Sequence, residues 1–552
     1  PKPQTPNPKP QTPTPKKLKL KKNVWSIIIM SELSKRDSLN VMESKTEFKD
    51  ENVKWTNFEH NGVIFAEDFV PTNIPIKFKG QRLELTTEQE EIATFWIQTL
   101  DSDWVTKEHY CQNFLNTFTA LFPKTSLIFQ NEKPKIEDFD FTDIQTEINK
   151  RKNSKKELSK EEKKKIKLLK EETDSKYKYI ILDGNVEKAS NIRLEPPTLF
   201  KGRGDHPKAG TLKSRTMPED VELNMGKLAL VPKCPLSGRC WGSVSFNQNS
   251  AYLASFPDSL GHRKYVLLAQ TSKLRYEADI KKFEIAKSLG PKIDHIREQY
   301  MKLMKSGSMD ERQLGAAVYL IDKLAIRAGN EKKEDEADTV GCCSLRVEHV
   351  ILENDNNVTF DFLGKDSIRY LNTVKVCPEV YLVLQDSEKG KNKESQLFEK
   401  LSPSKLNEFL SSLLPGLTAK VFRTYNASST LEKQIKIIEA KIQSKSTDEE
   451  KIKLYNEANR EVAILCNHQK AERKNFDEGL EKANSKIEDL KKKIKLVKKE
   501  NEKEKKKLKD RLRKMQNDVE ERKKNRTVAL GTSKTNYNDP RISVSFCKRV
   551  KL

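Results

Sequence analysis

The chain has 552 residues, of which 35% are hydrophobic and 34% are charged, and its formal net charge is +23. Such a positive excess favours a polyanionic partner, with nucleic acid ahead of an anionic membrane surface. No apolar stretch approaches the ~20 residues that a membrane-spanning helix needs. The short apolar run 25–30 lacks the length and the cleavage pattern of a secretory signal.

The eight cysteines and seven histidines show neither disulfide nor metal-ligand spacing. Cys342 and Cys343 are adjacent, Cys234 and Cys240 have no CxxC partner, and there is no HExxH motif. A phosphate-binding GxxxxGK[ST] loop is also absent from the sequence. We therefore expect free thiols in a reducing compartment, and a reaction that needs no cofactor, neither ATP nor a divalent metal.

Residues 1–45 form a Pro/Thr/Lys-rich basic tail that we expect to be extended or disordered. Its basic segment 15–22 fits either a nuclear import signal or a generic basic arm, and the sequence leaves both open.

Residues 46–271 have the pattern of a mixed α/β region, in which glycines and prolines separate short apolar runs. The charged segment 155–172 predicts a solvated helix with Ser159 as its N-cap. Strands are predicted at 63–65, 179–182 and 265–268.

Residues 272–469 are predicted to be mainly helical. One helix runs through 316–324, and Gly329 is its expected C-cap, which would put Arg327 at the end of that helix. The segment 358–370 predicts a β-hairpin whose turn lifts Lys365 and Asp366 away from the body.

Residues 470–526 are dense in Lys and Glu and have heptad-like apolar spacing that lapses through 498–507. A lapse between two apolar series favours a helical hairpin. A single continuous charged helix is the alternative. The apolar positions are Phe476, Leu480, Ile487, Leu490, Ile494 and Val497, then Leu508, Leu512, Met515 and Val519.

Five short segments carry the residues that suggest chemistry: KLAIRAGNE (323–331), FLGKDSIRY (362–370), TAKVFRTYN (418–426), ILCNHQ (464–469) and GTSKTNYNDPR (531–541). A lone tyrosine among small polar residues is usually an ordinary surface residue. Here the order Arg, Lys, Arg, His, Tyr, together with EPPTLFKGRGDHPKAG (195–210), resembles the eukaryotic DNA topoisomerases of type IB. The resemblance covers residues 53–548, nearly the whole chain.

The resemblance implies an α+β multidomain clamp around DNA. Its parts would be a mixed α/β cap region, a mainly helical catalytic core related to tyrosine recombinases, an antiparallel coiled-coil linker and a tyrosine-bearing domain at 527–552. Within the cap region, the charged segment 155–172 would correspond to the pair of basic helices that project above the DNA.

The resemblance also implies the reaction. Tyr537 would attack a phosphodiester and form a 3′-phosphotyrosyl link, and the free 5′ hydroxyl would later reseal the strand. Arg327, Arg423 and His468 would stabilise the phosphate oxygens, because guanidinium and imidazole donors match that charge. Lys365 would protonate the leaving oxygen.

The same resemblance implies a DNA-binding set and a partner. The partner is double-stranded DNA, held by a monomer in the nucleus with little sequence preference. Arg203, Asp366 and Asn536 would line the pocket that camptothecin-like poisons occupy. The DNA-binding residues are Lys201, Arg203, His206, Lys208, Asp366 and Asn536.

Three features depart from the family pattern: a shorter linker, only fifteen residues after Tyr537, and Asp205 where asparagine is common. The second predicts a truncated tyrosine domain, and the third adds a negative charge near the DNA. The sequence leaves two alternative functions open. One is a tyrosine recombinase that uses the same five residue types, and the other is a non-enzymatic DNA-binding relic.

Overall fold

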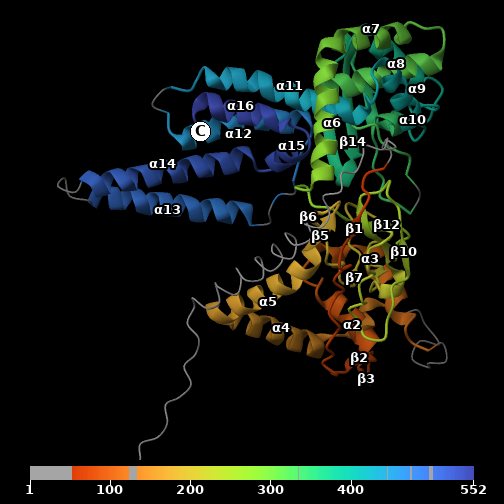
Figure 1. Cartoon of the computed structure of the whole chain (residues 1–552), viewed down its shortest axis with the longest axis vertical. Helices are drawn as coiled ribbons and strands as arrows, with labels where there is room; N and C mark the ends of the chain where they lie inside the picture. Colours follow the sequence, from red (N-terminus) through yellow and green to blue (C-terminus); the bar gives the residue numbers. More distant parts are fainter. Residues whose placement is uncertain are drawn as a thin grey trace, which may run out of the picture. The chain divides into compact units, whose positions relative to one another are not determined.

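The computed structural model describes residues 53–123, 134–332, 335–443, 446–470, 472, 475–496 and 502–552 (Figure 1). The predicted tail and Val497 lie outside these ranges. Residues 57–246 and 251–552 form one compact unit. In the other unit, the Trp55 indole N–H donates to the Ser250 carbonyl at 2.7 Å.

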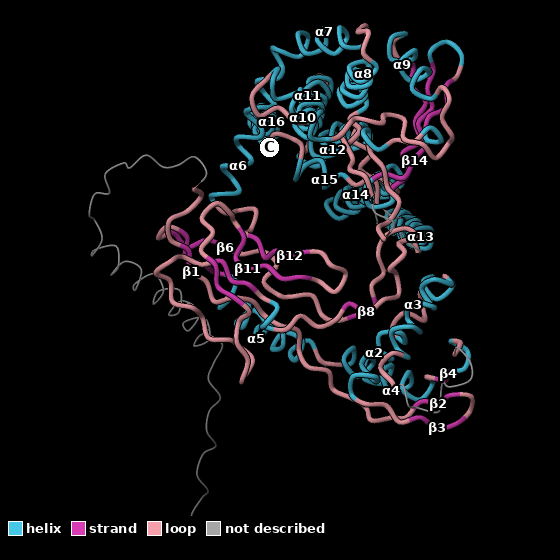
Figure 2. Tube along the Cα trace, turned by 90° about the vertical axis from the view of Figure 1, so that its right-hand side faces the viewer, coloured by secondary structure: helices cyan, strands magenta, loops and turns pink. Residues whose placement is uncertain are grey.

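Residues 58–267 combine helices with short strands, as predicted (Figure 2). The described sheets have the strand orders β1-β5-β6, β3-β2-β4, β7-β8 and β10-β9-β11-β12. The helices are α2 (Thr87–Ile97), α3 (Glu108–Thr119), α4 (Thr142–Glu157) and α5 (Lys160–Lys178). The strands are β1 (Phe58–Glu59), β2 (Ile76–Phe78), β3 (Gln81–Leu83), β4 (Phe139–Asp140), β5 (Tyr179–Leu182), β6 (Asn185–Lys188), β7 (Thr198–Leu199), β8 (Leu212–Lys213), β9 (Glu222–Asn224), β10 (Ser243–Ser245), β11 (Tyr252–Pro257) and β12 (Arg263–Leu267).

Of the predicted strands, 179–182 is confirmed as β5, and most of 265–268 lies in β12. The run 63–65 was predicted wrongly, because it forms only an isolated bridge between Ile64 and Arg193.

Buried aromatic rings hold α2 and α3 together. Trp96 stacks on Phe114 at 4.5 Å between ring centroids, and Phe114 stacks in turn on Phe118 at 5.4 Å. Offset aromatic pairs of this kind add to the stabilisation from apolar burial.

Helix α5 begins where the sequence predicts. Ser159 accepts from the Glu162 N–H at 3.1 Å, and the Glu162 carboxylate accepts from the Ser159 N–H at 2.9 Å. This reciprocal capping box satisfies two N–H groups that a helix start otherwise leaves open, so the predicted N-cap is confirmed.

Residues 273–465 are mainly helical, as predicted. Leu320, Phe360, Leu406 and Phe422 are fully buried in their apolar core. The helices are α6 (Lys273–Leu289), α7 (Ile293–Met304), α8 (Met309–Leu324), α9 (Pro378–Glu388), α10 (Pro403–Leu413), α11 (Ala419–Glu439) and α12 (Asp448–Leu465), and the strands are β13 (Val350–Leu352), β14 (Asn357–Gly364) and β15 (Ile368–Lys375). Strands β14 and β15 pair antiparallel, which confirms the predicted hairpin.

The predicted glycine C-cap of α8 is wrong. The helix ends at Leu324, and Ala325 takes the left-handed conformation with φ 50°. Gly329 serves another purpose, because a Cβ there would lie 2.4 Å from the Cα of Gly341. Two backbone segments cross at this point, and only glycine allows so close an approach. Arg327 therefore lies on the loop beyond the helix.

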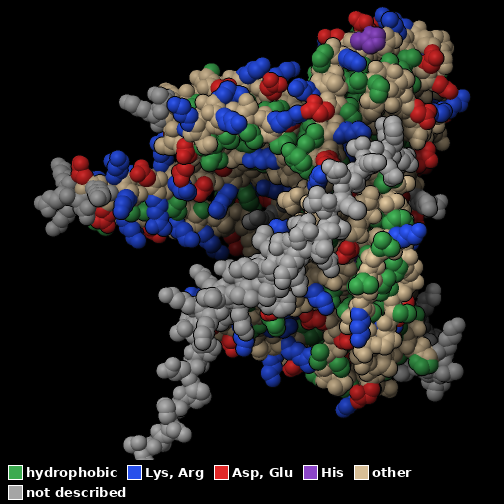
Figure 3. Space-filling view, in the orientation of Figure 1, with side chains coloured by type: hydrophobic (Ala, Val, Ile, Leu, Met, Phe, Trp, Pro, Cys, Tyr) green, Lys and Arg blue, Asp and Glu red, His purple; other side chains and the backbone are tan. Residues whose placement is uncertain are grey.

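Residues 476–524 form two helices, α13 (Phe476–Leu496) and α14 (Glu502–Lys524), which pack side by side (Figure 1). Their buried contacts come from Ile487, Leu490 and Val519. This arrangement agrees with a helical hairpin and not with a single rod. Exposed lysines and arginines run along both helices (Figure 3). Helices α15 (Leu530–Asn536) and α16 (Pro540–Val550) complete the chain.

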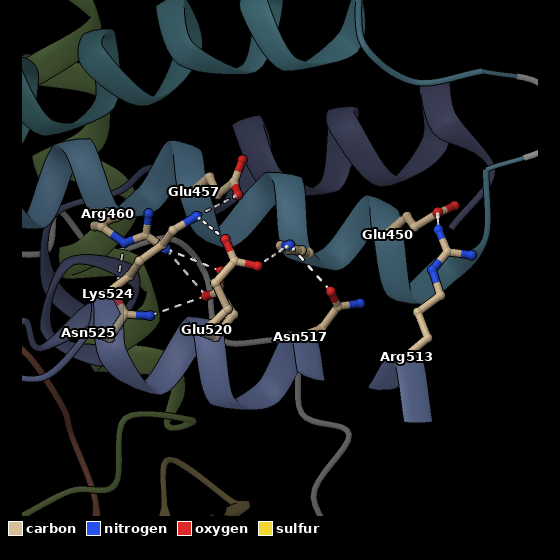
Figure 4. Close-up of polar contacts among 10 residues, drawn as sticks. Glu450, Glu457, Arg460, Arg513, Asn517, Glu520, Lys524 and Asn525 are labelled. Atoms are coloured by element: carbon tan, nitrogen blue, oxygen red, sulfur yellow. Dashed lines mark hydrogen bonds and ion pairs between the residues drawn. The ribbon is translucent and has the colours of Figure 1, made fainter. Parts of the chain in front are cut away.

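Helix α14 is attached to α12 by polar contacts (Figure 4). Arg460 donates to Glu521 at 3.3 Å and to Asn525 at 2.9 Å. Lys453 pairs with Glu520 at 3.3 Å. The linker interface, by which we mean these α12–α14 contacts, is thus built from charged side chains.

None of the described helices is long and apolar enough to cross a bilayer. All eight cysteines, each in a described range, are free thiols, as expected.

Candidate active site

A pocket of about 690 Å³ gathers four of the five predicted catalytic residues, Arg327, Lys365, Arg423 and His468. They come from separate elements: the loop after α8, the β14–β15 turn, helix α11 and the segment after α12. Tyr537 does not line this pocket in the described structure, but its ring contacts two of the residues that do.

Arg423 is buried, with 5% of its surface exposed. Its Nη1 donates to the Ala325 carbonyl at 2.8 Å, and its Nη2 donates to the Cys466 carbonyl. The left-handed turn at Ala325 therefore anchors this guanidinium. Among the described residues Arg423 forms no ion pair with a carboxylate, and its Nε has no hydrogen-bond partner. Burial lowers the pKa of the guanidinium.

His468 is also buried. Its Nδ1 lies 2.7 Å from the Ser533 hydroxyl, and its Nε2 has no partner among the described residues. Burial, reinforced by the positive charges of Arg423 and Arg327, lowers the pKa of this imidazole to about 3. His468 is therefore neutral near pH 7, because its charged form would lack solvent and stand beside two cations.

Tyr537 caps the C-terminal end of α15 and is half-buried. Its ring stacks on His468, with 5.2 Å between centroids and 26° between planes. The Arg423 guanidinium carbon lies 5.3 Å from the centroid of the same ring. The Ser428 hydroxyl donates to the Tyr537 carbonyl at 3.1 Å. Helix α11 thus holds the tyrosine segment as well as Arg423.

Lys365 is exposed on the turn between β14 and β15, where Asp366 and Ser367 both have positive φ. Arg327 is half-buried, and its carbonyl accepts from the Cys342 N–H at 2.8 Å. The site thus combines a flexible exposed ammonium with a guanidinium on a backbone-anchored loop.

The predicted DNA-binding residues divide into two groups. Arg203, His206 and Asp366 line the pocket, and Arg203 pairs with Asp366 at 2.5 Å. Their segment approaches the hairpin closely, since a Cβ on Gly204 would lie 2.4 Å from the Ser367 hydroxyl.

The other three lie outside the pocket lining. Lys208 pairs with Asp335 at 2.6 Å, Lys201 is exposed, and Asn536 is an exposed residue at the end of α15. Asp205, expected to add negative charge, forms an ion pair with Lys107. That pairing offsets much of the added charge.

Sequence reasoning missed the contact of Ser533 with His468 and the two carbonyls that hold Arg423. Ser533 stands in the quoted segment 531–541, four residues before Tyr537, and this one-turn spacing was the available signal. Nothing in the sequence marks the carbonyls of Ala325 and Cys466, because every residue has one.

Three family models match consecutive parts of the chain. They are the DNA binding fragment of eukaryotic DNA topoisomerase I at 53–268, its catalytic core at 271–501, and a C-terminal topoisomerase domain at 509–552.

Named relatives agree with these models. DNA topoisomerase 1 of Homo sapiens is 41% identical over 530 residues, which cover 90% of this chain and 68% of that protein. DNA topoisomerase 1 of Caenorhabditis elegans is 43% identical, over 92% of this chain and 66% of that protein. DNA topoisomerase 1 alpha of Arabidopsis thaliana is 42% identical, over 90% and 56%. The chain thus spans between about half and two thirds of the length of the curated relatives it matches. It belongs to the eukaryotic DNA topoisomerase I family.

Proposed function

We propose that this chain is a type IB DNA topoisomerase, an isomerase that relaxes supercoiled double-stranded DNA without ATP or a divalent metal. One observation carries the proposal. Arg423 Nε and His468 Nε2 are buried without hydrogen-bond partners in the described part of the chain, and both side chains contact the Tyr537 ring. Buried polar nitrogens are almost always hydrogen bonded. These two nitrogens beside the Tyr537 phenol therefore fit the non-bridging oxygens of a bound phosphodiester.

In the proposed cleavage step, the Tyr537 oxygen releases its proton to water and attacks phosphorus, and the bond from phosphorus to the 5′ oxygen breaks. The product is a 3′-phosphotyrosyl link and a free 5′ hydroxyl. Arg327, Arg423 and His468 stabilise the negative charge that grows on the equatorial oxygens. Lys365 supplies the proton to the 5′ oxygen. A mobile ammonium on an exposed turn suits that task, since it can follow the DNA strand.

Resealing reverses these steps. The 5′ hydroxyl attacks the phosphotyrosyl phosphorus and releases Tyr537, so the energy of the broken bond stays in the covalent link and no nucleotide is consumed. Between the two steps the downstream duplex rotates about the intact strand and loses supercoils.

The proposed partner is nuclear DNA. The protein would bind it as a monomer, through contacts with the phosphates and with little readout of the bases. A clamp formed by the cap region and a recombinase-related core would hold the duplex, and α13 and α14 would act as an antiparallel coiled-coil linker. Lys201, Arg203, His206, Lys208 and Asn536 would contact the DNA. The ion pair of Arg203 with Asp366 would mark the place where camptothecin-like poisons lodge.

Covalent trapping tests the proposal. Detergent quenching of the enzyme on a plasmid that lacks any recombination site should leave protein attached to a DNA 3′ end. Tyr537→Phe removes one hydroxyl and should abolish both trapping and relaxation while DNA binding persists. Attachment at a 5′ end would overturn the type IB assignment. Activity only on a specific site would favour a tyrosine recombinase, and binding without trapping would favour a relic.

A further inference from the structure

We propose that Ser533 is a positioning residue for His468. Its hydroxyl donates to Nδ1 of the imidazole and so fixes the tautomer that carries its proton on Nε2. The catalytic consequence of this inference rests on the proposed function, but the tautomer itself does not.

The hydrogen-bonding options of the Ser533 hydroxyl indicate that it donates to the imidazole of His468. Ser533 is fully buried, and its Oγ lies 2.7 Å from Nδ1 of His468. Within the described part of the chain this hydroxyl has no other hydrogen bond. Were it to accept from an Nδ1–H, its own proton would be buried without an acceptor, which costs about 1–3 kcal/mol. Donation to Nδ1 avoids that cost.

The protonation state of the His468 ring determines which nitrogen carries the proton. A neutral imidazole has one N–H and one bare nitrogen, so a bare Nδ1 requires an Nε2–H. Burial and two neighbouring cations keep the ring neutral. Its Nε2 is buried and has no hydrogen-bond partner among the residues that the structure describes, and His468 lines the pocket. The other tautomer would present a lone pair to an anionic phosphate, which repels it.

The same residue also fixes the tyrosine segment. The Ser533 carbonyl accepts from the Tyr537 N–H at 3.0 Å and from the Asn538 N–H at 2.9 Å. One residue of α15 thus sets the donor state of His468 and the start of the turn that carries Tyr537. The imidazole is prepared as a donor when the tyrosine segment is docked.

The direct test is the tautomer of His468 in the full wild-type chain, read from the ¹⁵N chemical shifts of its ring. The resonance is assigned by its loss in His468→Gln. We expect the Nε2–H tautomer, without DNA as well as with it. An Nδ1–H tautomer in the wild type would overturn the proposal, and this result needs no variant of Ser533 to fold.

Variants test the consequence. Ser533→Ala should leave a mixture of tautomers and slow cleavage about 3- to 10-fold, the effect of losing one ordinary hydrogen bond. Thr535→Ala is the matched control, because that hydroxyl lies on the same helix and donates to the Gly531 carbonyl instead. The control should cleave at the wild-type rate.

A purely structural role for Ser533 is separated by a double-variant cycle. In a His468→Ala background, Ser533→Ala should have little further effect, since it acts through the missing ring. Full additivity of the two losses would refute the positioning role. Absence of any covalent trapping in the wild type, with the Nε2–H tautomer present, would refute the proposed function and leave the tautomer assignment standing.

Discussion

Arg423 of the pocket and the cations of the linker interface are held in opposite ways. At the linker interface, Arg460 and Lys524 face carboxylates on the neighbouring helix, Glu521 and Glu457, at 3.3 and 3.9 Å. In the pocket, Arg423 is held by two backbone carbonyls and has no carboxylate among its described partners. The linker cations are neutralised within the protein, whereas Arg423 keeps its positive charge.

This difference separates a structural use of charge from a chemical one. Partial charges of carbonyls fix the position of a guanidinium without cancelling its charge, so the field remains available to an anionic ligand. A carboxylate partner would compete with phosphate for the same donors. The carboxylate partners at the linker interface, in contrast, cancel the charge of the cations that they face while they hold two helices together. Four predictions test this comparison.

The largest expected effect in the pocket is that of Lys365→Ala, which should slow cleavage by about two to four orders of magnitude, as loss of a general acid does. Sulfur in place of the leaving 5′ oxygen should shrink this defect, because a thiolate leaves without a proton. Lys375→Ala, an exposed lysine at the far end of the same hairpin, should behave as wild type. A defect that stays the same size on the sulfur substrate would refute the general-acid role.

Next, Arg423→Ala should reduce the single-turnover cleavage rate by about two to three orders of magnitude, the usual effect of removing one oxyanion donor. Arg423→Lys should restore little, since an ammonium cannot reach both carbonyls and a phosphate in the fixed geometry of a guanidinium. Arg513→Ala is the control at the linker interface, where Arg513 pairs with Glu450. Equal losses at the two arginines would erase the distinction drawn above.

A third prediction concerns pH and stability. The pKa of His468 is about 3 in the folded chain, against about 6.5 when unfolded. As the pH falls below about 6.5, the unfolded state binds a proton on His468 and the folded state does not. The free energy of unfolding therefore decreases as the pH falls. The wild type should lose about 2 kcal/mol more of its free energy of unfolding than His468→Gln between pH 7.5 and pH 5. Chemical denaturation at both pH values measures this, and identical losses would contradict it.

The smallest effect is expected at the linker interface. Glu521→Gln should destabilise the docking of α14 by about 1 kcal/mol or less, and the difference should diminish in high salt. Amide hydrogen exchange over 502–524 reports this, and cleavage should be unchanged. Glu488→Gln is the matched control, because Glu488 pairs with Lys491 within α13. A larger loss of stability would mean that the linker interface is held by more than ion pairs that salt can screen.

Local features were predictable from the sequence, and contacts between distant segments were not. The Ser159 cap depends on residues three apart, and the β14–β15 hairpin depends on a short turn between two apolar runs, so both are visible in a linear pattern. The five predicted catalytic positions came from the family resemblance of short segments and from their order along the chain. The end of α8 was misassigned because Gly329 satisfies a backbone crossing with Gly341, which no neighbouring residue reveals.

The same limit applies to the site. Arg423 is held by the carbonyls of Ala325 and Cys466, which lie 98 and 43 residues away in sequence. Side-chain identity does not encode such acceptors. The pairing of Asp205 with Lys107 was likewise invisible, although the unusual aspartate itself was noted.

One feature bears on how the chain closes upon itself. The two strands of backbone that leave and re-enter the site are tied together at its edge: Gln469 bridges Val528, the Lys470 N–H donates to the Thr527 carbonyl at 2.7 Å, and the Ala529 N–H donates to the His468 carbonyl at 2.8 Å. In polymer terms, the segment 471–526 between these contacts is a closed loop. These contacts fix the two ends whatever the length of chain between them, because even for a flexible loop the free energy of closure changes by only about 0.6 kcal/mol for each doubling of its length. The number of residues between 471 and 526 can therefore change during evolution. The pairing of 468–470 with 527–529 still sets the position of His468 relative to Tyr537.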